Sequence, residues 1–423
     1  MSSVLLRRAA LLLCVVTALM LLACNENGEE LPRLLFSSGQ VLYSVKADVS
    51  GLQEAASLPV KEPGAVLSPD GKQLAFACRA DQALSGPQTD ICLSTSSGSN
   101  VRVATQGKLP ASSMVSGEIA WTPDSRQLAF VTDLYEDQSF TAAGELYLLN
   151  VEDQQVRVLV PGTPGVQRSL LRWSPDGRHL ALLGATAASP ETAFEVVDVQ
   201  DGARLDLTEK IEGQASISHF AWSPDSSVLA FVRTVWRSPF TSGIAGVEIY
   251  SIAVDGSNLS RLPDLGDWPE RVVWSPDGRW LAVTAAPLGG GFPRIYMVPA
   301  DGGEPHLLAP SLVLSDYPAW SPDGQRLAFA GAESAADPNT YPSPALYMAD
   351  VQGGDLRQLA SGIQASPLVT WSPDGRRVFF TSQDSPCTGG CPPGFLFSAP
   401  ADGSASAVQL TDFPVDRLLG WEP

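Results

Sequence analysis

The sequence predicts an all-β fold made of eight similar four-stranded antiparallel sheets, and three observations lead to this prediction. A motif that begins Trp-Ser-Pro-Asp-Gly and continues into Leu-Ala-Phe, or a close variant, recurs along the chain. The copies are evenly spaced, and each interval between them carries signals for four strands. Helical periodicity is absent after the first 30 residues. A period of about 50 residues indicates one supersecondary unit per repeat, which stacks on its neighbours to bury its faces.

The motif occurs seven times in full. Four copies are nearly identical, two are looser and one has leucine in place of tryptophan; they begin at Trp173, Trp274, Trp320 and Trp371, at Trp121 and Trp222, and at Leu67. The motif aspartates are 54, 52, 49, 52, 46 and 51 residues apart, at Asp70, Asp124, Asp176, Asp225, Asp277, Asp323 and Asp374. A truncated copy follows at Trp421.

The copy at Trp274 shows how one unit is built. Strands are expected at residues 271–274, 280–283, 293–298 and 305–308. In the first turn Pro276 presets φ, Asp277 can bond its own backbone and Gly278 takes a positive φ. The second strand is apolar at consecutive positions, which is typical of a strand covered on both faces. We therefore interpret the motif aspartates as turn residues and the motif tryptophans as packing between units.

Four-stranded sheets packed face to face around an axis are the blades of a β-propeller. The repeats resemble the TolB-type, WD-repeat-like β-propeller family, whose signature is this W-S-P-D-G turn followed by L-A-F. The resemblance covers residues 33–423 and implies the fold. It does not imply one function, because the same repeat serves binding proteins and the propeller domains of enzymes.

The two ends of the repeat region are expected to share one blade. Residues 33–36, 41–45 and 54–58 look like second, third and fourth strands without a first strand, and residues 417–421 look like a first strand alone. Seven complete units and one split unit give an eight-bladed propeller of four-stranded antiparallel blades, closed by pairing of the N- and C-terminal strands. Such closure removes open sheet edges. The alternative is seven blades with both end segments outside.

The N-terminal residues have the pattern of a bacterial lipoprotein signal. Arg7 and Arg8 precede an apolar run that is too short for a typical membrane span and ends in Leu-Leu-Ala-Cys. This sequence resembles a lipobox, with Cys24 as the lipidated residue; the alternative is an ordinary secretory signal with a chance cysteine. We expect an extracytoplasmic protein of the cell envelope or periplasm, with a signal peptide (1–23), a polar tether (24–32) and a single propeller domain (33–423).

Charge and cysteine content narrow the classes of partner. The formal net charge of −19 disfavours nucleic acid and anionic membrane surfaces, so the membrane is expected to be touched through the lipid anchor only. We expect a monomer without a cofactor or metal.

The cysteines form two candidate pairs. Cys78 and Cys92 lie on two strands of one blade, and Cys387 and Cys391 lie in one loop, CTGGC. Exported chains favour disulfides, whereas the metal alternative for CTGGC lacks further ligands.

Two regions are candidates for binding. The connections from second to third strands are long and share one face, here called the long-loop face, opposite the turn face of the W-S-P-D-G turns. Its candidate aromatic residues are Tyr135, Phe140, Trp236, Phe240, Phe292 and Tyr341. The channel mouth is lined by residues three and four before the motif tryptophan, namely Glu118, His219, Glu270, Arg271, Asp316, Tyr317 and Arg417. The alternatives are rings that pack loops onto the blades, and a water-filled channel with mutually satisfied charges.

No catalytic motif accompanies these candidates. The sequence has no G-x-S-x-G elbow and no H-E-x-x-H pair, and of its three histidines only His219 holds a channel position. The favoured function is therefore non-enzymatic binding of a protein, peptide or glycan through the long-loop face. The alternative is a carbohydrate-active enzyme, a lyase or hydrolase, with its site at the channel mouth.

Overall fold

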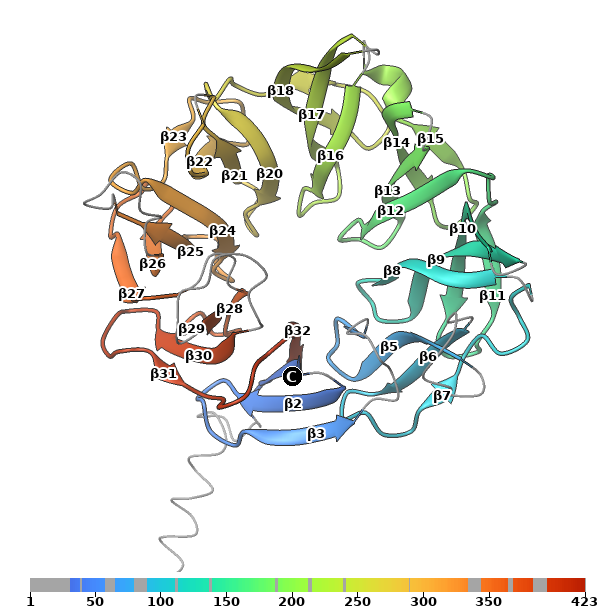
Figure 1. Ribbon diagram of the computed structural model, residues 1–423, viewed down its shortest axis with the longest axis horizontal. Helices are drawn as coiled ribbons and strands as arrows, with labels where there is room; N and C mark the ends of the chain where they lie inside the picture. Colours follow the sequence, from blue (N-terminus) through green and yellow to red (C-terminus); the bar gives the residue numbers. More distant parts are fainter. Residues whose placement is uncertain are drawn as a thin grey trace, which may run out of the picture.

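The computed structural model describes residues 31–422, apart from 39, 58–64, 80–89, 111–112, 137–138, 187–188, 212–214, 239–240, 289, 334–343, 364–367 and 383–393. Within these residues the strands form eight four-stranded antiparallel sheets arranged as a ring (Figure 1). The prediction of an eight-bladed β-propeller is thus confirmed. No helix in the described part of the chain is long and apolar enough to cross a membrane.

Each blade runs from an innermost strand to an outer strand. The innermost strands of blades 1 to 8 are β4 (Val66–Leu67), β8 (Ser113–Trp121), β12 (Val166–Trp173), β16 (Ala215–Trp222), β20 (Trp268–Trp274), β24 (Leu314–Trp320), β28 (Val369–Trp371) and β32 (Arg417–Glu422). The second strands are β5 (Gln73–Cys78), β9 (Gln127–Glu136), β13 (His179–Thr186), β17 (Val228–Ser238), β21 (Trp280–Ala286), β25 (Arg326–Ala332), β29 (Arg377–Ser382) and β1 (Arg33–Ser38).

The two remaining positions complete the blades in the same order. The third strands are β6 (Asp90–Thr95), β10 (Ser139–Asn150), β14 (Ser189–Asp198), β18 (Thr241–Ala253), β22 (Arg294–Pro299), β26 (Ala345–Asp350), β30 (Phe395–Pro400) and β2 (Val41–Lys46). The outer strands are β7 (Arg102–Val103), β11 (Val156–Val160), β15 (Arg204–Asp206), β19 (Ser260–Arg261), β23 (His306–Leu307), β27 (Arg357–Ala360), β31 (Val408–Gln409) and β3 (Gln53–Ser57). One short 3-10 helix, η1 (Thr208–Lys210), follows β15.

Every motif turn is fixed by the same pair of side chains. The aspartate Oδ1 accepts a hydrogen bond from the serine or threonine hydroxyl two residues earlier, at 2.5–2.6 Å in all seven copies. The same hydroxyl oxygen accepts the backbone N–H five residues later, where the second strand begins. The geometry agrees with the interpretation of these aspartates as turn residues.

The two looser motif copies have a structural explanation. Ser125 and Ser226 stand where the other five copies have glycine, and both adopt positive φ, 61° and 65°. Their hydroxyls accept the backbone N–H of Asp70 and Asp176, the motif aspartates of the preceding blades, at 3.0 and 2.9 Å. At both positions a hydrogen bond between neighbouring blades therefore accompanies a positive φ, which is unfavourable for residues other than glycine.

The chain ends close the ring through one blade. In blade 8, β32 pairs antiparallel with β1, and Leu34 lies opposite Trp421. The Ser96 hydroxyl of blade 1 donates a hydrogen bond to the Glu422 carboxylate, which ties β32 to the next blade as well. The expected pairing of residues 417–421 beside residues 33–36 is confirmed.

The hydrophobic core is divided among the blade interfaces. Eight clusters of buried side chains lie between neighbouring blades, one at each interface. The indole N–H of five motif tryptophans donates to a backbone carbonyl of the preceding innermost strand, at 2.9–3.2 Å, from Trp121, Trp173, Trp222, Trp274 and Trp371. Both features agree with the interpretation of the tryptophans as packing between blades.

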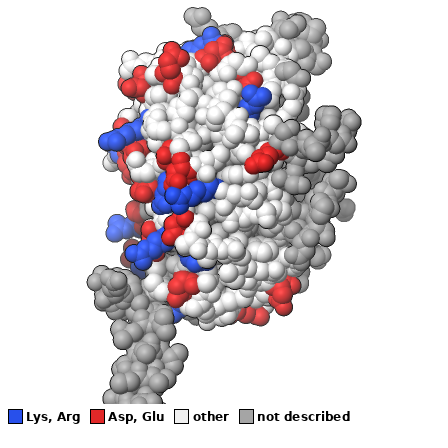
Figure 2. All heavy atoms as spheres, turned by 90° about the vertical axis from the view of Figure 1, so that its left-hand side faces the viewer, with Lys and Arg blue, Asp and Glu red and all other residues white. Residues whose placement is uncertain are grey.

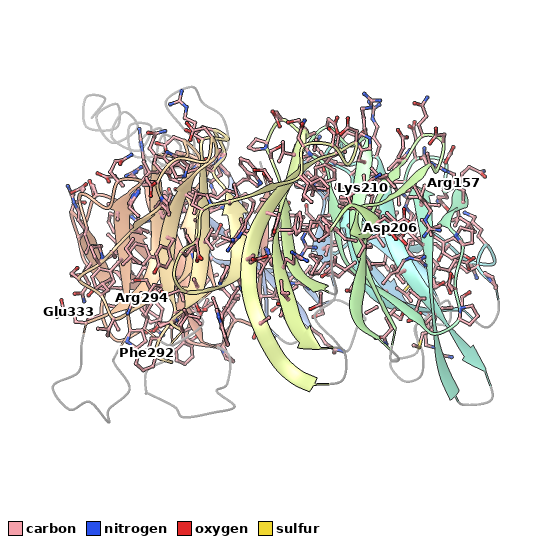
Figure 3. The ribbon with its side chains drawn as sticks, turned by 90° about the horizontal axis from the view of Figure 1, so that it is seen from above. Arg157, Asp206, Lys210, Phe292, Arg294 and Glu333 are labelled. Atoms are coloured by element: carbon pink, nitrogen blue, oxygen red, sulfur yellow. A yellow bond between two sulfur atoms is a disulfide. The ribbon has the colours of Figure 1, made fainter. Side chains whose placement is uncertain are left out.

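Three of the expected long loops are largely β-hairpins. The segments 132–144, 184–192 and 233–246 continue the second and third strands of blades 2, 3 and 4, so that β17 and β18 reach 11 and 13 residues against 6 in β1 and β2. We call these three adjacent hairpins, β9–β10, β13–β14 and β17–β18, the hairpin wall. Figure 3 shows the β17–β18 hairpin projecting past the body of the disc on the long-loop side.

Candidate functional site

An irregularity recurs where the innermost strands line the channel. In blades 2 to 6 the pairing of the innermost strand with the second strand shifts register within the six residues that precede the motif tryptophan. Such bulges take backbone groups out of the ladder and re-aim side chains. The candidate channel residues of blades 2, 4, 5 and 6 lie at or next to these shifts.

Two of these candidates bridge neighbouring blades. The Glu118 Oε2 atom accepts the backbone N–H of Leu171 at 3.1 Å and the Arg172 Nη1 at 2.7 Å. His219 Nδ1 accepts the backbone N–H of Val272 at 3.5 Å. In both cases the donor N–H lies in the next innermost strand, two residues before the motif tryptophan. A side chain from one blade thus satisfies a backbone donor of the next blade.

Electrostatics couples the same residues. Burial lowers the pKa of His219 to about 4, and the positive charges of Arg271 and Arg172 act in the same direction. Burial raises the pKa of Glu270, the negative charge of Asp316 adds to this effect, and Arg271 opposes it. Glu118, Arg172, His219, Glu270, Arg271 and Asp316, contributed by blades 2 to 6 in order, are called the charged arc below.

The charged arc contains five of the seven predicted channel residues. Tyr317 lies in the same strand as Asp316, whereas Arg417 opens β32 in blade 8, opposite Ser37, and lies outside the arc in blade order. Arg172 was missed because it directly precedes a motif tryptophan. Five other blades have alanine or valine directly before the first motif residue, so a charged residue there was an available signal; they are Val66, Ala120, Ala221, Val273 and Ala319.

The predicted residues of the long-loop face have different outcomes. Figure 3 shows Phe292 and Glu333 toward one face of the disc, and Arg157 and Lys210 toward the other. The backbones of Tyr135 and Phe140 lie opposite each other in the hairpin wall, and Trp236 lies opposite Ile244. Phe240 and Tyr341 lie outside the described residues, as do Cys24, Cys387 and Cys391.

Exposed apolar side chains mark the long-loop face of blades 5 to 7. Trp268 is 38% exposed at the start of β20, and Leu288 is 60% exposed in the loop that follows β21. Val313 and Leu368 are each 36% exposed and immediately precede β24 and β28. Innermost strands begin at this face because they end in the motif turns. These four residues, called the apolar crescent, could not be separated from core residues in the sequence.

Charge is distributed unevenly over the surface. Figure 2 shows the side of the disc with blades 5 and 6, where charged side chains gather toward one edge and much of the remaining visible surface is uncharged. The turns of this region carry Asp277, Arg279, Asp323, Asp355 and Arg357. The edge of the turn face is therefore the charged one.

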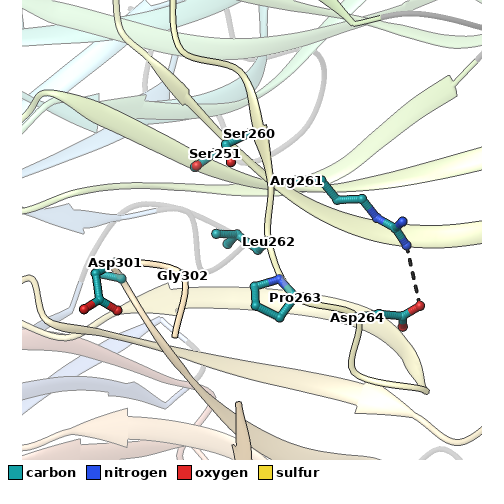
Figure 4. Close-up of a pocket in the computed structure, with 9 residues that line it drawn as sticks. Ser251, Ser260, Arg261, Leu262, Pro263, Asp264, Asp301 and Gly302 are labelled. Atoms are coloured by element: carbon teal, nitrogen blue, oxygen red, sulfur yellow. Dashed lines mark ion pairs between the residues drawn. The ribbon is translucent and has the colours of Figure 1, made fainter. Parts of the chain in front are cut away.

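A polar hollow of about 390 Å³ lies on the surface between blades 4 and 5 (Figure 4). Its lining includes Ser251, Ser260 and the turn residue Asp301. Arg261 forms ion pairs there with Asp264 at 3.6 Å and with Glu248 at 3.4 Å. These charges satisfy one another in an exposed setting. In the described ranges, no group of three or more His, Cys, Asp or Glu side chains could hold a metal ion.

The second and third strands of blade 1 are joined by a disulfide. Cys78 and Cys92 are bonded across β5 and β6, with their Cα atoms 5.8 Å apart. Cys92 lies opposite Phe76 in the ladder and Cys78 lies opposite Asp90, so the bond is diagonal. The predicted pairing of Cys78 with Cys92 is confirmed.

Comparison with known proteins supports the fold and leaves the function open. No protein-family model matches the chain. An uncharacterized protein of Agrobacterium fabrum, Atu1656, is 25% identical over 288 residues, which are 59% of this chain and 96% of that protein. The uncharacterized peptidase YuxL of Bacillus subtilis is 27% identical over 173 residues, but the match spans only 39% of this chain and 21% of YuxL.

Two solved structures share the architecture. Porphyromonas gingivalis dipeptidyl peptidase 4 gives a TM-score of 0.57 at 15% identity, covering 83% of this chain and 53% of that one. An oligogalacturonate lyase in complex with manganese gives a TM-score of 0.52 at 17% identity, covering 83% and 93%. At these identities the likeness shows the fold alone. The protein is therefore a β-propeller, and its finer resemblance to TolB-type repeats stays a prediction.

Proposed function

We propose that this propeller is an extracytoplasmic binding protein, anchored by a lipid on Cys24, that holds a protein or peptide partner against its long-loop face. The apolar crescent carries this proposal. Four large apolar side chains at one face of three successive blades are a feature of interaction sites, whereas scattered exposed apolar residues are normal. A glycan partner is the other outcome of the test below.

The hairpin wall supports a polypeptide partner. It lengthens the second and third strands of blades 2 to 4 at the same face on which blades 5 to 7 carry the apolar crescent. In β18, only Tyr250 and Ser251 pair with the outer strand β19. A long third strand with a short outer neighbour offers backbone groups that an extended peptide can pair with.

The disulfide supports the proposed location. Disulfides persist in oxidising compartments and are rare in the bacterial cytosol. Cys78 and Cys92 are 5% and 1% exposed, so their bond is part of the folded core.

The proposed function is tested by matched variants of the full-length protein in affinity capture from cell-envelope extracts. Trp268→Ala and Leu288→Asp should reduce capture of a specific partner about tenfold or more, because anchors in an interface centre carry most of the affinity. Leu259→Asp and Arg279→Glu are the controls, since Leu259 is also an exposed apolar residue, at 36%, but precedes β19 near the turn face. Loss of capture in the controls, with retention in the first pair, would place binding on the turn face.

The hairpin wall can be tested separately because its register is known. Val235 lies opposite Gly246, so residues 236–245 can be replaced by an Asn-Gly turn that closes the shortened hairpin. The matched variant replaces residues 185–192 between Gly184 and Ala193. Weaker capture by either variant, with an unchanged unfolding midpoint, supports the wall as part of the site.

The charged arc favours a second candidate function, a carbohydrate-active lyase or hydrolase. The observation behind this candidate is a pair of shifted pKa values in one part of the channel. The pKa of His219 is lowered, so its ring is neutral at pH 7, and the pKa of Glu270 is raised. Such shifts are common in acid–base sites. A glycan turnover screen with and without divalent metal tests it. Turnover that is lost in both His219→Gln and Glu270→Gln would favour the enzyme.

A further inference from the structure

The polar hollow between blades 4 and 5 lies where the repeat places two serines side by side. Ser251 pairs with Ala230, the alanine of the Leu-Ala-Phe motif, and Ser260 pairs with Ser251 from the outer strand. Figure 4 shows both serines at the hollow, whereas Arg261 points away from them toward Asp264. We call this space the serine hollow. Its volume of about 390 Å³ is within the range of small-ligand pockets, roughly 300–1,000 Å³.

Four other blades have larger side chains at both of these positions. Opposite the motif alanine, their third strands carry leucine or methionine. The outer strand then carries arginine or histidine opposite that residue, and the pairs are Leu93 with Arg102, Leu148 with Arg157, Met297 with His306 and Met348 with Arg357. Because blade 4 has serine at both positions, it leaves open a space that these blades fill.

The basic side chains of the four blades all bind the next blade. Each contacts a backbone carbonyl in the turn after the third strand of that blade, and the pairs are Arg102 with Val151, Arg157 with Val199, His306 with Val351 and Arg357 with Asp402. The corresponding turn of blade 5 begins at Ala300, which lines the serine hollow. Ser260 is too short to reach across as an arginine does. The repeat therefore provides the acceptor at this interface without its usual donor.

A serine opposite the second strand has a precedent of its own. Blades 7 and 8 also have serine at the ladder position of Ser251. In each of them an arginine of the same blade donates to the serine hydroxyl through Nε, from Arg377 to Ser398 at 2.9 Å and from Arg33 to Ser44 at 3.0 Å. The corresponding residue of blade 4 is Val228, the first residue of β17. Blade 4 therefore has the serine without the arginine.

The charges around the serine hollow favour a cation. Two arginines face three carboxylates there, namely Arg233 and Arg261 with Glu248, Asp264 and Asp301. Arg261 pairs with Glu248 at 3.4 Å and with Asp264 at 3.6 Å, so its charge is offset. One added cation would balance the group. A guanidinium has five N–H donors and no acceptor, which suits a wall of hydroxyl, carbonyl and carboxylate oxygens.

We infer that the serine hollow binds the guanidinium group of an arginine side chain from another polypeptide. Its N–H groups donate to the Ser251 hydroxyl and the Ala300 carbonyl, and Asp301 balances its charge. A side chain is the favoured source because the other blades fill this space with the end of an arginine that enters from a neighbouring strand. The serine hollow lies at the rim of the turn face, so the contact does not rest on the function proposed for the long-loop face.

The inference is tested with small probes on the full-length protein. N-acetyl-arginine-N-methylamide presents the guanidinium as in a peptide, and methylguanidinium presents it alone. The citrulline analogue keeps the shape without the charge, and the lysine analogue keeps the charge without the planar fork. Binding is measured by ligand-detected NMR at concentrations on the order of 10 mM, since one polar group binds weakly. We expect the arginine probe to bind at least about threefold more tightly than the citrulline and lysine probes.

Filling the hollow should abolish binding of the arginine probe. Ser260→Arg supplies the basic side chain found at Arg102, and Ser251→Leu supplies the leucine found at Leu93. Each should weaken binding about tenfold or more. Two positions are used because one variant can disturb folding, and unfolding midpoints verify that both fold. Leu259→Arg is the matched control, since it adds the same charge at the exposed residue next to Ser260, and it should bind the probe as the unchanged protein does.

Failure at any of four points would overturn the inference. The first is absence of binding by both guanidinium probes, and the second is binding of the citrulline or lysine probe as tightly as the arginine probe. The third is equal binding by the unchanged protein and both filled variants, or an equal loss in Leu259→Arg, which would make charge alone responsible. The fourth is binding of methylguanidinium with exclusion of the arginine probe, which would identify a site for a small cation and not for a side chain.

Discussion

The imidazole of His219 joins two blades, because its Nδ1 accepts the backbone N–H of Val272 at 3.5 Å. Glu118 makes the equivalent contact with the N–H of Leu171 two blades earlier, at 3.1 Å. An acceptor at Nδ1 requires that atom to be unprotonated, so the neutral ring carries its proton on Nε2. Both candidate channel residues therefore belong to the blade interface as well as to the channel wall.

The contact makes stability dependent on pH. Burial, with Arg271 and Arg172, lowers the pKa of folded His219 to about 4, below the ordinary value of 6.5. Between these values the unfolded chain binds a proton that the folded chain refuses. The stabilisation is therefore complete above pH 6.5 and is lost as pH falls through about 4. Urea unfolding at pH 7.5 and 4.5 should show this loss in the unchanged protein and a smaller one in His219→Gln.

The control for this prediction is another histidine. His306 contacts the Val351 carbonyl at 3.0 Å through Nε2 and lies in an outer strand. His306→Gln should keep the pH dependence of the unchanged protein. Glu270 is present in every variant, so its contribution to the pH dependence of stability is the same in each and cancels in the comparison. An identical slope in His219→Gln would assign the pH dependence to other groups.

The turn hydrogen bonds should contribute measurable stability. Asp225 accepts from the Ser223 hydroxyl at 2.6 Å, and from the Ser227 N–H and hydroxyl at 3.0 and 2.8 Å. The Ser223 hydroxyl, aided by Ser227, holds the pKa of Asp225 below its usual value. Asp225→Ala should lower the free energy of unfolding by about 1–2 kcal/mol. Glu209→Ala, an exposed residue of η1, should change it by less than about 0.5 kcal/mol.

The Cys78–Cys92 disulfide should stabilise blade 1. The two residues are 14 apart, and closing a loop of this size in the unfolded chain contributes about 3 kcal/mol. The Cys78→Ser/Cys92→Ser protein should unfold at lower denaturant than the oxidised protein. Reduction of the unchanged protein should produce a similar shift, and reduction of the double variant, in which the expected Cys387–Cys391 bond closes only a short ring, should produce a much smaller one. Equal midpoints in all samples would mean that the bond does not constrain unfolding.

The repeat makes the fold predictable because each motif turn uses only local contacts. The serine hydroxyl, the aspartate and the residue at positive φ lie within a few residues of one another. The turn conformation of one motif copy is therefore expected in all seven copies. The pairing of β1 with β32 could be predicted because the unit that begins at residues 33–36 lacked a first strand and residues 417–421 formed a first strand alone. The hairpin wall was not foreseen, because segments such as 132–144 mix small and polar residues, and strand continuation there depends on pairing between them.

The candidate site was less predictable than the fold. Position relative to the motif tryptophan identified Glu118 and His219, since position sets which strand a residue occupies. It could not reveal that both accept backbone N–H groups of the next blade, because that depends on the register shifts in the innermost strands. The apolar crescent was missed for a related reason. Exposure of Trp268 or Leu368 depends on where an innermost strand begins relative to its neighbours, which apolar character alone does not record.

Acylation of Cys24 remains a direct prediction from Leu21-Leu22-Ala23-Cys24. Metabolic labelling with a fatty-acid analogue should mark the full-length protein and leave Cys24→Ala unlabelled. Cys14→Ala, in the apolar run, is the matched control and should label normally. Equal labelling of the Cys24 variant would mean that this cysteine carries no lipid.

The last prediction concerns ring closure by β32. Trp421 lies opposite Leu34 and packs on Phe379 of blade 7, while Glu422 accepts a bond from Ser96 of blade 1, so β32 connects three blades. Trp421→Ala should cost about 3 kcal/mol, at the low end for a large-to-small change because the side chain is half-buried. Trp268→Ala is the matched control, since Trp268 is exposed and should lose partner capture with little loss of stability.

Deletion of residues 417–423 should be more damaging than either substitution. It removes β32 entirely and leaves β1 with an unpaired edge, which favours association between chains. Denaturant unfolding and sedimentation, on proteins without the signal segment, measure the two effects. We expect a lower midpoint and concentration-dependent oligomers for the deletion, and a lower midpoint alone for Trp421→Ala. A deleted protein that stays monomeric at the original midpoint would show that the paired strand β32 contributes nothing to closure, and blade 8 would then be stable with three strands.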